Sequence, residues 1–222
     1  MIVRDDNYMV VSKNVFPAAW DEHLYPEWAA IRILRYTPEQ RKGQGVEPHY
    51  HDCDEYWHFT SGYGEAWLDG QVYEITPNSA VYTPMGVVHR FQMFTDFETV
   101  DARTAFEGPK GRSGHLIVKD DGIPTPTADG FVVAGGLNNG SFPDRGPRCP
   151  LTELRTVAGN DSEPEEGKLF ANEHWVVLNG TARLILEDTE FQLSQGDVAL
   201  LKSGLSRRIR FSSGASAVVA RE

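Results

Sequence analysis

Four side chains with metal-binding groups follow a regular spacing in the first half of the chain. They are His49, His51, Glu55 and His89. Residues i and i+2 of a β-strand point to the same face, so His49 and His51 can project together into a barrel, and the other two must converge from neighbouring strands. Three imidazoles and one carboxylate suit a divalent transition metal (Fe, Mn, Ni, Co or Zn) and fit calcium or magnesium poorly. The spacing predicts one such metal per chain.

The residues around these ligands complete a recognisable pattern. The segment 43–62 begins and ends with glycine, and the segment 84–89 reads proline, one residue, glycine, two residues, histidine. This double block resembles the two motifs of the cupin superfamily. The second motif departs at Asn78, where a glycine is usual, and at Met93, where an asparagine is often found. The resemblance implies a jelly-roll barrel, the double-stranded β-helix, around one metal ion.

Composition narrows the fold and the partners. The chain has 222 residues and a formal net charge of −11, which argues against binding to nucleic acid or to an anionic membrane surface. Short runs of aromatic and β-branched residues separated by Gly, Pro, Asn and Asp predict an all-β fold. The N-terminal sequence lacks a long apolar run, and two cysteines are too few for a disulfide framework. We expect a cytoplasmic monomer or homodimer that acts on a small molecule.

An internal repeat appears when the chain is aligned with itself at an offset of 118. Glu55 then aligns with Glu173, and His89 aligns with Arg207, without a gap. The second copy, EHWVVLNGTARL with FQLSQGDVALLKSG after it, resembles the cupin domain of bacterial phosphomannose isomerases. We therefore predict two tandem cupin barrels, a bicupin, with an N-terminal barrel at 1–107, a connection at 108–150 and a C-terminal barrel at 151–222.

The second copy has lost the metal ligands. Gly167, Leu169 and Arg207 stand at the positions that match the three histidines, and only Glu173 keeps a ligand type. Strand alternation places Arg207 inside the barrel and Arg208 outside it. An inward arginine needs a partner, so we predict that Glu173 and Arg207 form an ion pair at this degenerate second site. An alternative is that Arg207 binds an anion.

Strand alternation also gives a set of pocket residues in the first copy. Trp57, Phe59, Phe91 and Met93 should point inward with the metal ligands and form an apolar substrate pocket. Glu47 lies two residues before His49. It is a candidate catalytic carboxylate that moves protons near the metal, or else a rim residue in water.

Other polar residues lie on the same predicted strands. Arg32, Arg35 and Tyr36 alternate faces in the segment IRILRY, and one set could reach a carboxylate or phosphate of the substrate. Tyr56 and His58 have the opposite parity to the pocket residues, which predicts that they lie on the outer face of the barrel.

Two segments outside the repeats should also pack on the barrels. Residues 108–150 hold six of the thirteen prolines and nine of the twenty-one glycines, which predicts a long irregular connection with a short strand near 130–134. The first thirty residues are too apolar for a disordered tail. We expect them to cross a barrel and to add an edge strand to the other half.

Two chemistries fit a metal held in this way, with one or two coordination positions open. In the first, the metal polarises a carbonyl or hydroxyl of a sugar-like or hydroxy-acid molecule, and proton transfer gives an isomerase, epimerase or lyase. In the second, Fe(II) binds substrate and dioxygen, as in a non-haem iron dioxygenase. A third possibility is a metal-bearing binding module without catalysis. The full ligand set favours an enzyme, and the resemblance of the second copy to phosphomannose isomerases favours the first chemistry.

Overall fold

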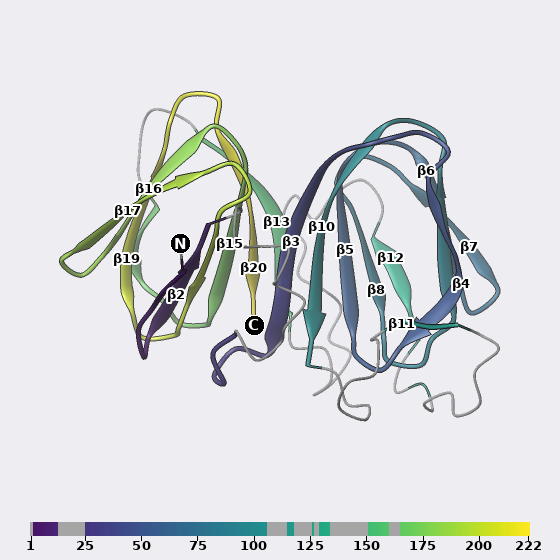
Figure 1. The fold of residues 1–222 in the computed structure, drawn as a ribbon, viewed down its shortest axis with the longest axis horizontal. Coiled ribbons are helices and arrows are strands. Elements are labelled where there is room, and N and C mark those ends of the chain that lie inside the picture. Colours follow the sequence, from purple (N-terminus) through teal and green to yellow (C-terminus); the bar gives the residue numbers. More distant parts are fainter. Residues whose placement is uncertain are drawn as a thin grey trace.

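The computed structural model describes residues 2–12, 25–105, 115–117, 126, 129–133, 151–159 and 165–222. Every regular element within these ranges is a β-strand, and the strands form antiparallel sheets that close into two barrels side by side (Figure 1). The predicted all-β fold of two tandem barrels is confirmed. No helix long and apolar enough to cross a membrane occurs in the described part of the chain.

The first barrel consists of two five-stranded sheets. One has the order β12(Phe131–Val133), β8(Ser79–Thr83), β5(Glu55–Ser61), β10(Phe97–Thr104), β3(Ile31–Gln40). The other has the order β11(His115–Ile117), β4(Gly45–His51), β9(His89–Met93), β6(Gly64–Leu68), β7(Gln71–Ile75). The predicted short strand near 130–134 is confirmed by β12, which pairs with β8.

The second barrel is built from a six-stranded and a four-stranded sheet. The six-stranded sheet has the order β1(Ile2–Arg4), β2(Tyr8–Val11), β18(Val198–Leu201), β15(Glu173–Asn179), β20(Ser216–Arg221), β13(Glu153–Ala158). The four-stranded sheet has the order β14(Glu165–Lys168), β19(Ser206–Phe211), β16(Thr181–Leu186), β17(Thr189–Ser194).

Three apolar cores separate the four sheets. Trp57, Phe59 and their neighbours fill the first barrel, and Trp175 with its neighbours fills the second. The third core, which includes Tyr56, Tyr82 and Val176, lies between the two inner sheets and joins the barrels. Residues at the centres of β5 and β15 are therefore buried on both faces. The outer strand β9 instead alternates between buried and more exposed positions, as expected for a sheet with one solvated face.

The N-terminal segment contributes strands to the second barrel. Val11 lies opposite Val198, and Tyr8 lies opposite Leu201, so β2 extends the sheet of β18. The expected edge strand in the other half is confirmed, while residues 13–24 lie outside the described residues. Strand pairing thus crosses the predicted 1–107 boundary, because β18 had an unpaired edge that the N-terminal strand covers. The division of the chain into folding units at 1–107, 108–150 and 151–222 stays a prediction.

The two barrels repeat the same pairing register at the offset of 118. His49 lies opposite His89 in the first barrel, and Gly167 lies opposite Arg207 in the second. The turn before β8 also matches between the barrels. Asn78, with a left-handed φ of 66°, donates its backbone N–H to the carbonyl oxygen of Phe59, and Gly196 donates to that of Val177. Asparagine tolerates that conformation better than most residues, so the departure from the motif leaves the turn intact.

Candidate metal centre

The strand ends of the first barrel bring the four predicted ligands together. His49 and His51 lie on β4, while Glu55 and His89 are the first residues of β5 and β9. One ligand atom from each residue lies within 4.8 Å of the others, and all four side chains are buried. Pairing of β4 with β9 sets two of the imidazoles directly opposite each other. The four residues that the sequence predicted as ligands are therefore the four that the structure brings together.

The distances within the cluster are short. His49 Nε2 lies 3.1 Å from His51 Nε2, and Glu55 Oε2 lies 3.0 Å from His51 Nε2 and 3.2 Å from His89 Nε2. One carboxylate oxygen therefore faces the imidazole nitrogens. This is a ligand set of three nitrogens and one oxygen with no thiolate.

Backbone carbonyls fix the tautomers of two histidines. His49 Nδ1 lies 2.8 Å from the carbonyl oxygen of Glu47, and His89 Nδ1 lies 2.9 Å from that of Val87. A carbonyl only accepts, so Nδ1 carries the proton, and in a neutral ring Nε2 presents its lone pair to the centre. Burial, together with the neighbouring His89 and His51, lowers the pKa of His49 to about 4, so this ring is neutral at pH 7.

This arrangement of electron pairs fits a metal cation. Glu55 Oε2 and His89 Nε2 are buried and face each other. Neither atom has a partner with hydrogen-bond geometry among the residues that the structure describes. Lone pairs and a negative charge gathered in a buried space repel one another unless a cation lies between them. A divalent transition metal bound to these four residues would satisfy them all.

Sequence reasoning missed Arg103, which contacts the carboxylate of the cluster. Arg103 lies on β10 opposite Glu55, and its Nη2 is 2.5 Å from Glu55 Oε1. Asp101 holds the same guanidinium through contacts of 3.2 and 3.0 Å. Burial raises the pKa of Glu55, but Arg103 and His51 outweigh it and hold that pKa well below its usual range. Glu55 is therefore ionised, with Oε1 bound by the arginine and Oε2 facing the imidazoles.

A signal for Arg103 was present in the sequence. The offset of 118 carries Arg103 onto Arg221, just as it carries Glu55 onto Glu173. In the structure Arg221 lies opposite Glu173 and donates from Nε to Glu173 Oε1 at 2.9 Å. The glutamate–arginine pair thus occurs at matching positions of both barrels, with or without the metal ligands.

The four predicted pocket residues all point into the first barrel. Trp57, Phe59, Phe91 and Met93 belong to its apolar core. The ring centroids of Trp57 and Phe91 are 5.1 Å apart, and those of Phe59 and Phe91 are 5.6 Å apart. These side chains form a close-packed apolar layer within the barrel. Their contact with a substrate stays a prediction.

The structure places the side chain of Glu47 in water at the rim, which is the alternative to a catalytic carboxylate near the metal. The pairing of β4 with β9 shifts register between Val46 and His49, because β4 contains one extra residue there. Val46 packs against the barrel core, whereas the side chain of Glu47 is exposed. Glu47 lines a groove of about 420 Å³ together with Trp67 and Arg90, which lie on the solvated face of their strands. Its carbonyl orients His49, and its carboxylate lies outside the barrel.

The other polar residues of the predicted strands make internal contacts. Arg32 donates to the carbonyl oxygens of residues 25–27, and Arg35 Nη2 lies 3.6 Å from Asp101. Tyr56 and His58 face away from the first barrel, as predicted, but both are buried because the second barrel covers that face. His58 Nε2 lies 3.0 Å from the hydroxyl of Thr156.

The predicted ion pair of the second barrel is confirmed. Arg207 Nε lies 3.1 Å from Glu173 Oε2, and both side chains are buried. Arg208, the next residue, is exposed. Burial raises the pKa of Glu173, but Arg207 and the other donors outweigh it, so the pKa is lowered. A guanidinium therefore joins β15 and β19, the two strands that correspond to the ligand-bearing β5 and β9 of the first barrel.

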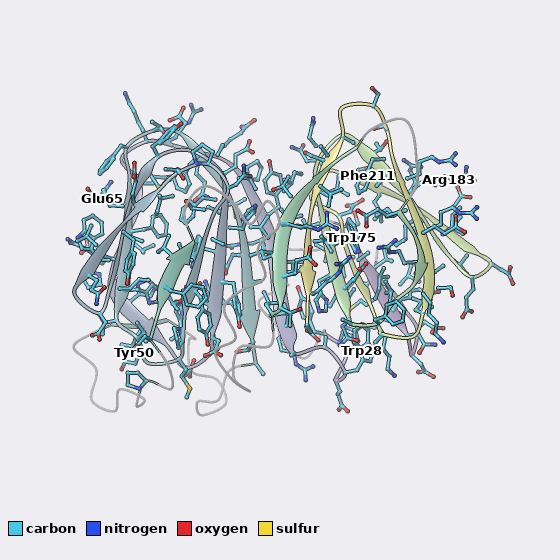
Figure 2. All side chains as sticks on the ribbon, turned by 180° about the vertical axis from the view of Figure 1, so that it is seen from behind. Trp28, Tyr50, Glu65, Trp175, Arg183 and Phe211 are labelled. Carbon is cyan, nitrogen blue, oxygen red and sulfur yellow. The ribbon has the colours of Figure 1, made fainter. Side chains whose placement is uncertain are left out.

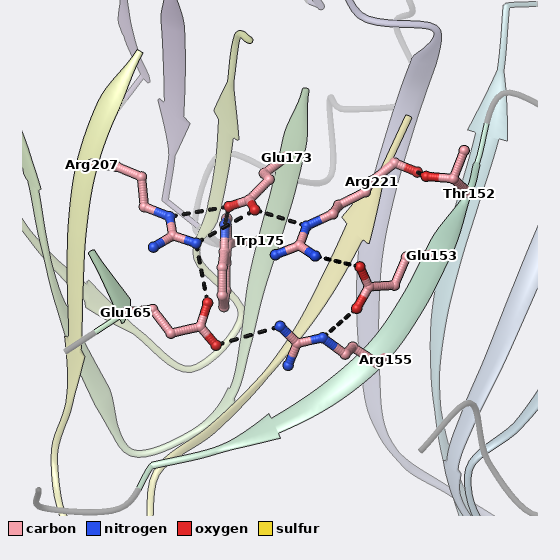
Figure 3. Close-up of polar contacts among 8 residues, drawn as sticks. All are labelled: Thr152, Glu153, Arg155, Glu165, Glu173, Trp175, Arg207 and Arg221. Carbon is pink, nitrogen blue, oxygen red and sulfur yellow. Dashed lines mark hydrogen bonds and ion pairs between the residues drawn. The ribbon is translucent and has the colours of Figure 1, made fainter. Parts of the chain in front are cut away.

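The pair belongs to a closed ring of three glutamates and three arginines (Figure 3). Successive members of the ring are Arg207, Glu173, Arg221, Glu153, Arg155 and Glu165, with the last contacting Arg207 again. Opposite charges alternate throughout, so the ring is neutral. It joins five strands of the second barrel, whose side chains are shown from behind in Figure 2.

Comparison with known proteins connects this geometry to a family of domains. Residues 39–100 match the family model of the cupin domain. An uncharacterized protein, y4oW of Sinorhizobium fredii (strain NBRC 101917 / NGR234), is 34% identical over 76 residues. That match covers 34% of this chain and 35% of the relative, so the chain spans only about a third of the relative's length.

Solved structures share the fold over the whole chain. The protein Ylba from E. coli is 11% identical, with a TM-score of 0.57, over 100% of this chain and 93% of that one. An oxalate decarboxylase from Bacillus subtilis is 11% identical, with a TM-score of 0.57, over 100% of this chain and 75% of that one. A salicylate 1,2-dioxygenase from Pseudoaminobacter salicylatoxidans is 10% identical, with a TM-score of 0.55, over 100% of this chain and 85% of that one. At these identities the likeness concerns the fold alone. Together with the match of residues 39–100 to the cupin domain, it supports the assignment of this chain to the cupin superfamily.

Proposed function

We propose that this protein is a metal-dependent enzyme that acts on a small polar molecule by metal-assisted proton transfer. The observation that carries the proposal is the convergence of three imidazoles and one carboxylate, with ligand atoms within 4.8 Å of one another. A divalent metal held there would act as a Lewis acid on a carbonyl or hydroxyl of the substrate. The reaction would be of the isomerase, epimerase or lyase type.

The chain's own residues prepare the site for such a reaction. The carbonyl groups of Glu47 and Val87 orient two imidazoles, and Arg103 binds one oxygen of Glu55. The aromatic layer of Trp57 and Phe91 keeps the barrel interior apolar, which strengthens electrostatic interactions at the metal. Glu47 is not proposed as the base, because its side chain lies outside the barrel.

The solved neighbours support a small polar substrate. Two of them are named as enzymes of small carboxylates, oxalate and salicylate, and the oxalate decarboxylase contains Mn(II) centres. The resemblance of EHWVVLNGTARL to phosphomannose isomerases points instead to sugar-like molecules. A hydroxy acid or a sugar acid combines both features. We further propose that the chain is a bicupin, which the shared pairing register of its two barrels supports.

The metal is tested by elemental analysis of protein purified without chelator. We expect about one transition-metal ion per chain, and its loss in His51→Ala, because a three-ligand remnant binds much more weakly. His174→Ala is the matched control, since His174 is buried in the second barrel and belongs to no ligand cluster within the described residues. Two metal ions per chain, or full occupancy in His51→Ala, would contradict the assignment.

The reaction type is tested by turnover with and without oxygen. A panel of small hydroxy acids and sugar acids is incubated with the metal-loaded protein, and product is followed by NMR. Equal rates in air and under anaerobic conditions support proton transfer. Oxygen uptake stoichiometric with product would replace this proposal with the dioxygenase, which the salicylate 1,2-dioxygenase neighbour makes the second candidate. Tight binding without product would instead indicate a binding module.

A further inference from the structure

A pocket occurs in the second barrel where the first barrel holds its ligand cluster. Its volume is about 230 Å³, and its lining includes Gly167, Leu169, Glu173 and Arg207. These four residues align with His49, His51, Glu55 and His89 of the first barrel at the offset of 118. A Cβ atom built on Gly167 would have no heavy atom within 4 Å. The space that an imidazole fills in the first barrel is therefore open here.

Two arginines at this pocket keep unused donors. Arg207 bonds through Nε and Nη2, and Arg221 bonds through Nε and Nη1. Among the described residues, the remaining terminal nitrogen of each guanidinium has no hydrogen-bond acceptor, and neither nitrogen is sealed from solvent. Each of these groups carries two N–H donors. Lys168, which is exposed, adds a third cation to the lining.

The carboxylates of the pocket are already neutralised. Glu173 is bound by both arginines of the lining. Glu166 accepts two hydrogen bonds, at 2.7 and 2.8 Å, from Arg208 on the outer face. Arg207 and Arg221 belong to the neutral ring, so the lining with its ion-pair partners has a net charge of +1, which Lys168 supplies. This small positive excess occurs in a chain with a net charge of −11.

The rest of the lining is apolar and includes an aromatic ring without cover. Phe170 is 99% exposed, the highest value among the large hydrophobic residues described, and Leu169 lies next to it. A fully solvated phenylalanine beside a cationic pocket suits a ligand that brings both an apolar part and an anionic group. A cavity of about 230 Å³ has the size of a molecule of roughly ten heavy atoms.

We propose that this pocket is a second ligand site, which binds a small organic monocarboxylate. The carboxylate accepts charge-assisted hydrogen bonds from the terminal NH2 groups that Arg207 and Arg221 leave free. The apolar part of the ligand lies against Leu169 and Phe170. This site needs no metal, so it is independent of the cluster in the first barrel.

Isothermal titration of the whole protein with benzoate tests the proposal. We expect saturable binding with one site per chain. Phe170→Ala should weaken it by roughly 3- to 10-fold through loss of the ring contact. Lys168→Ala should weaken it by about 2- to 5-fold through loss of an exposed charge. Both residues are exposed, so neither change should disturb folding. His49→Ala and added chelator should leave the affinity for benzoate unchanged.

Three results would overturn the proposal. The first is absence of saturable heat with benzoate. The second is loss of benzoate binding in His49→Ala or with chelator, which would place the ligand at the first barrel's metal. The third is inorganic phosphate binding at least as tightly as benzoate, which would show that the site lacks the proposed preference for an organic carboxylate. Full metal occupancy in His51→Ala would contradict only the proposed function and would leave this second site untouched.

Discussion

Glu173 should contribute more to stability than any exposed glutamate of comparable pairing. Its buried carboxylate accepts hydrogen bonds from Arg207 Nε at 3.1 Å, Arg207 Nη2 at 3.4 Å, Arg221 Nε at 2.9 Å and Trp175 Nε1 at 3.0 Å. Glu173→Ala removes this acceptor and leaves two guanidinium groups and an indole N–H without it. Breaking a buried pair in this way costs about 3–5 kcal/mol.

The expected change in melting temperature follows from the size of the chain. In proteins of about 150–250 residues, 1 kcal/mol corresponds to roughly 2–4 °C. Glu173→Ala should therefore melt about 6–20 °C below the wild type in a calorimetric scan. Glu173→Gln should lie between the two, because the amide keeps an acceptor oxygen but loses the charge.

Glu190→Ala is the matched control. Glu190 also forms a two-bond pair with an arginine, Arg183, but both side chains are about half exposed. Exposed pairs contribute about 0–1 kcal/mol, so this variant should melt within about 4 °C of the wild type. Equal melting temperatures for Glu173→Ala and Glu190→Ala would refute the view that the buried ring replaces a metal as the link between strands.

Two further predictions concern Arg103 and His58. Arg103→Lys keeps the charge but loses the planar fork on Glu55, so metal affinity measured by competition with a chelator should fall by about 10- to 100-fold, and an unchanged affinity would remove its positioning role. Burial lowers the pKa of His58 to about 4, whereas the unfolded value is about 6.5. The unfolded chain therefore binds the extra proton as pH falls through this window, and stability decreases by about 2–3 kcal/mol between pH 7 and pH 4. In urea unfolding, His58→Gln should lose less stability over this range than the wild type; an identical loss would show that His58 titrates normally.

The spacing of residues along the chain determined the ligands and the repeat. His49, His51, Glu55 and His89 converge as predicted. Alternation along β4 directs two histidines to one face, and the spacing of the two motifs already implied that a second strand would bring His89 to them. The offset of 118 predicted the pairing of Arg207 with Glu173 for the same reason, since aligned strands in two similar barrels keep the same register. The all-β fold also followed from composition and turn signals.

Contacts between distant strands decided the rest. One extra residue in β4 turned Glu47 outward, and no periodicity in the sequence marks where a bulge interrupts alternation. Arg103 reaches Glu55 only because β10 pairs with β5, 48 positions away. His58 lies on the outer face of its barrel, as alternation predicts, yet the second barrel buries that face and changes its chemistry. A sequence specifies which face a side chain takes, whereas the packing of sheets determines whether that face meets water, another side chain or a ligand.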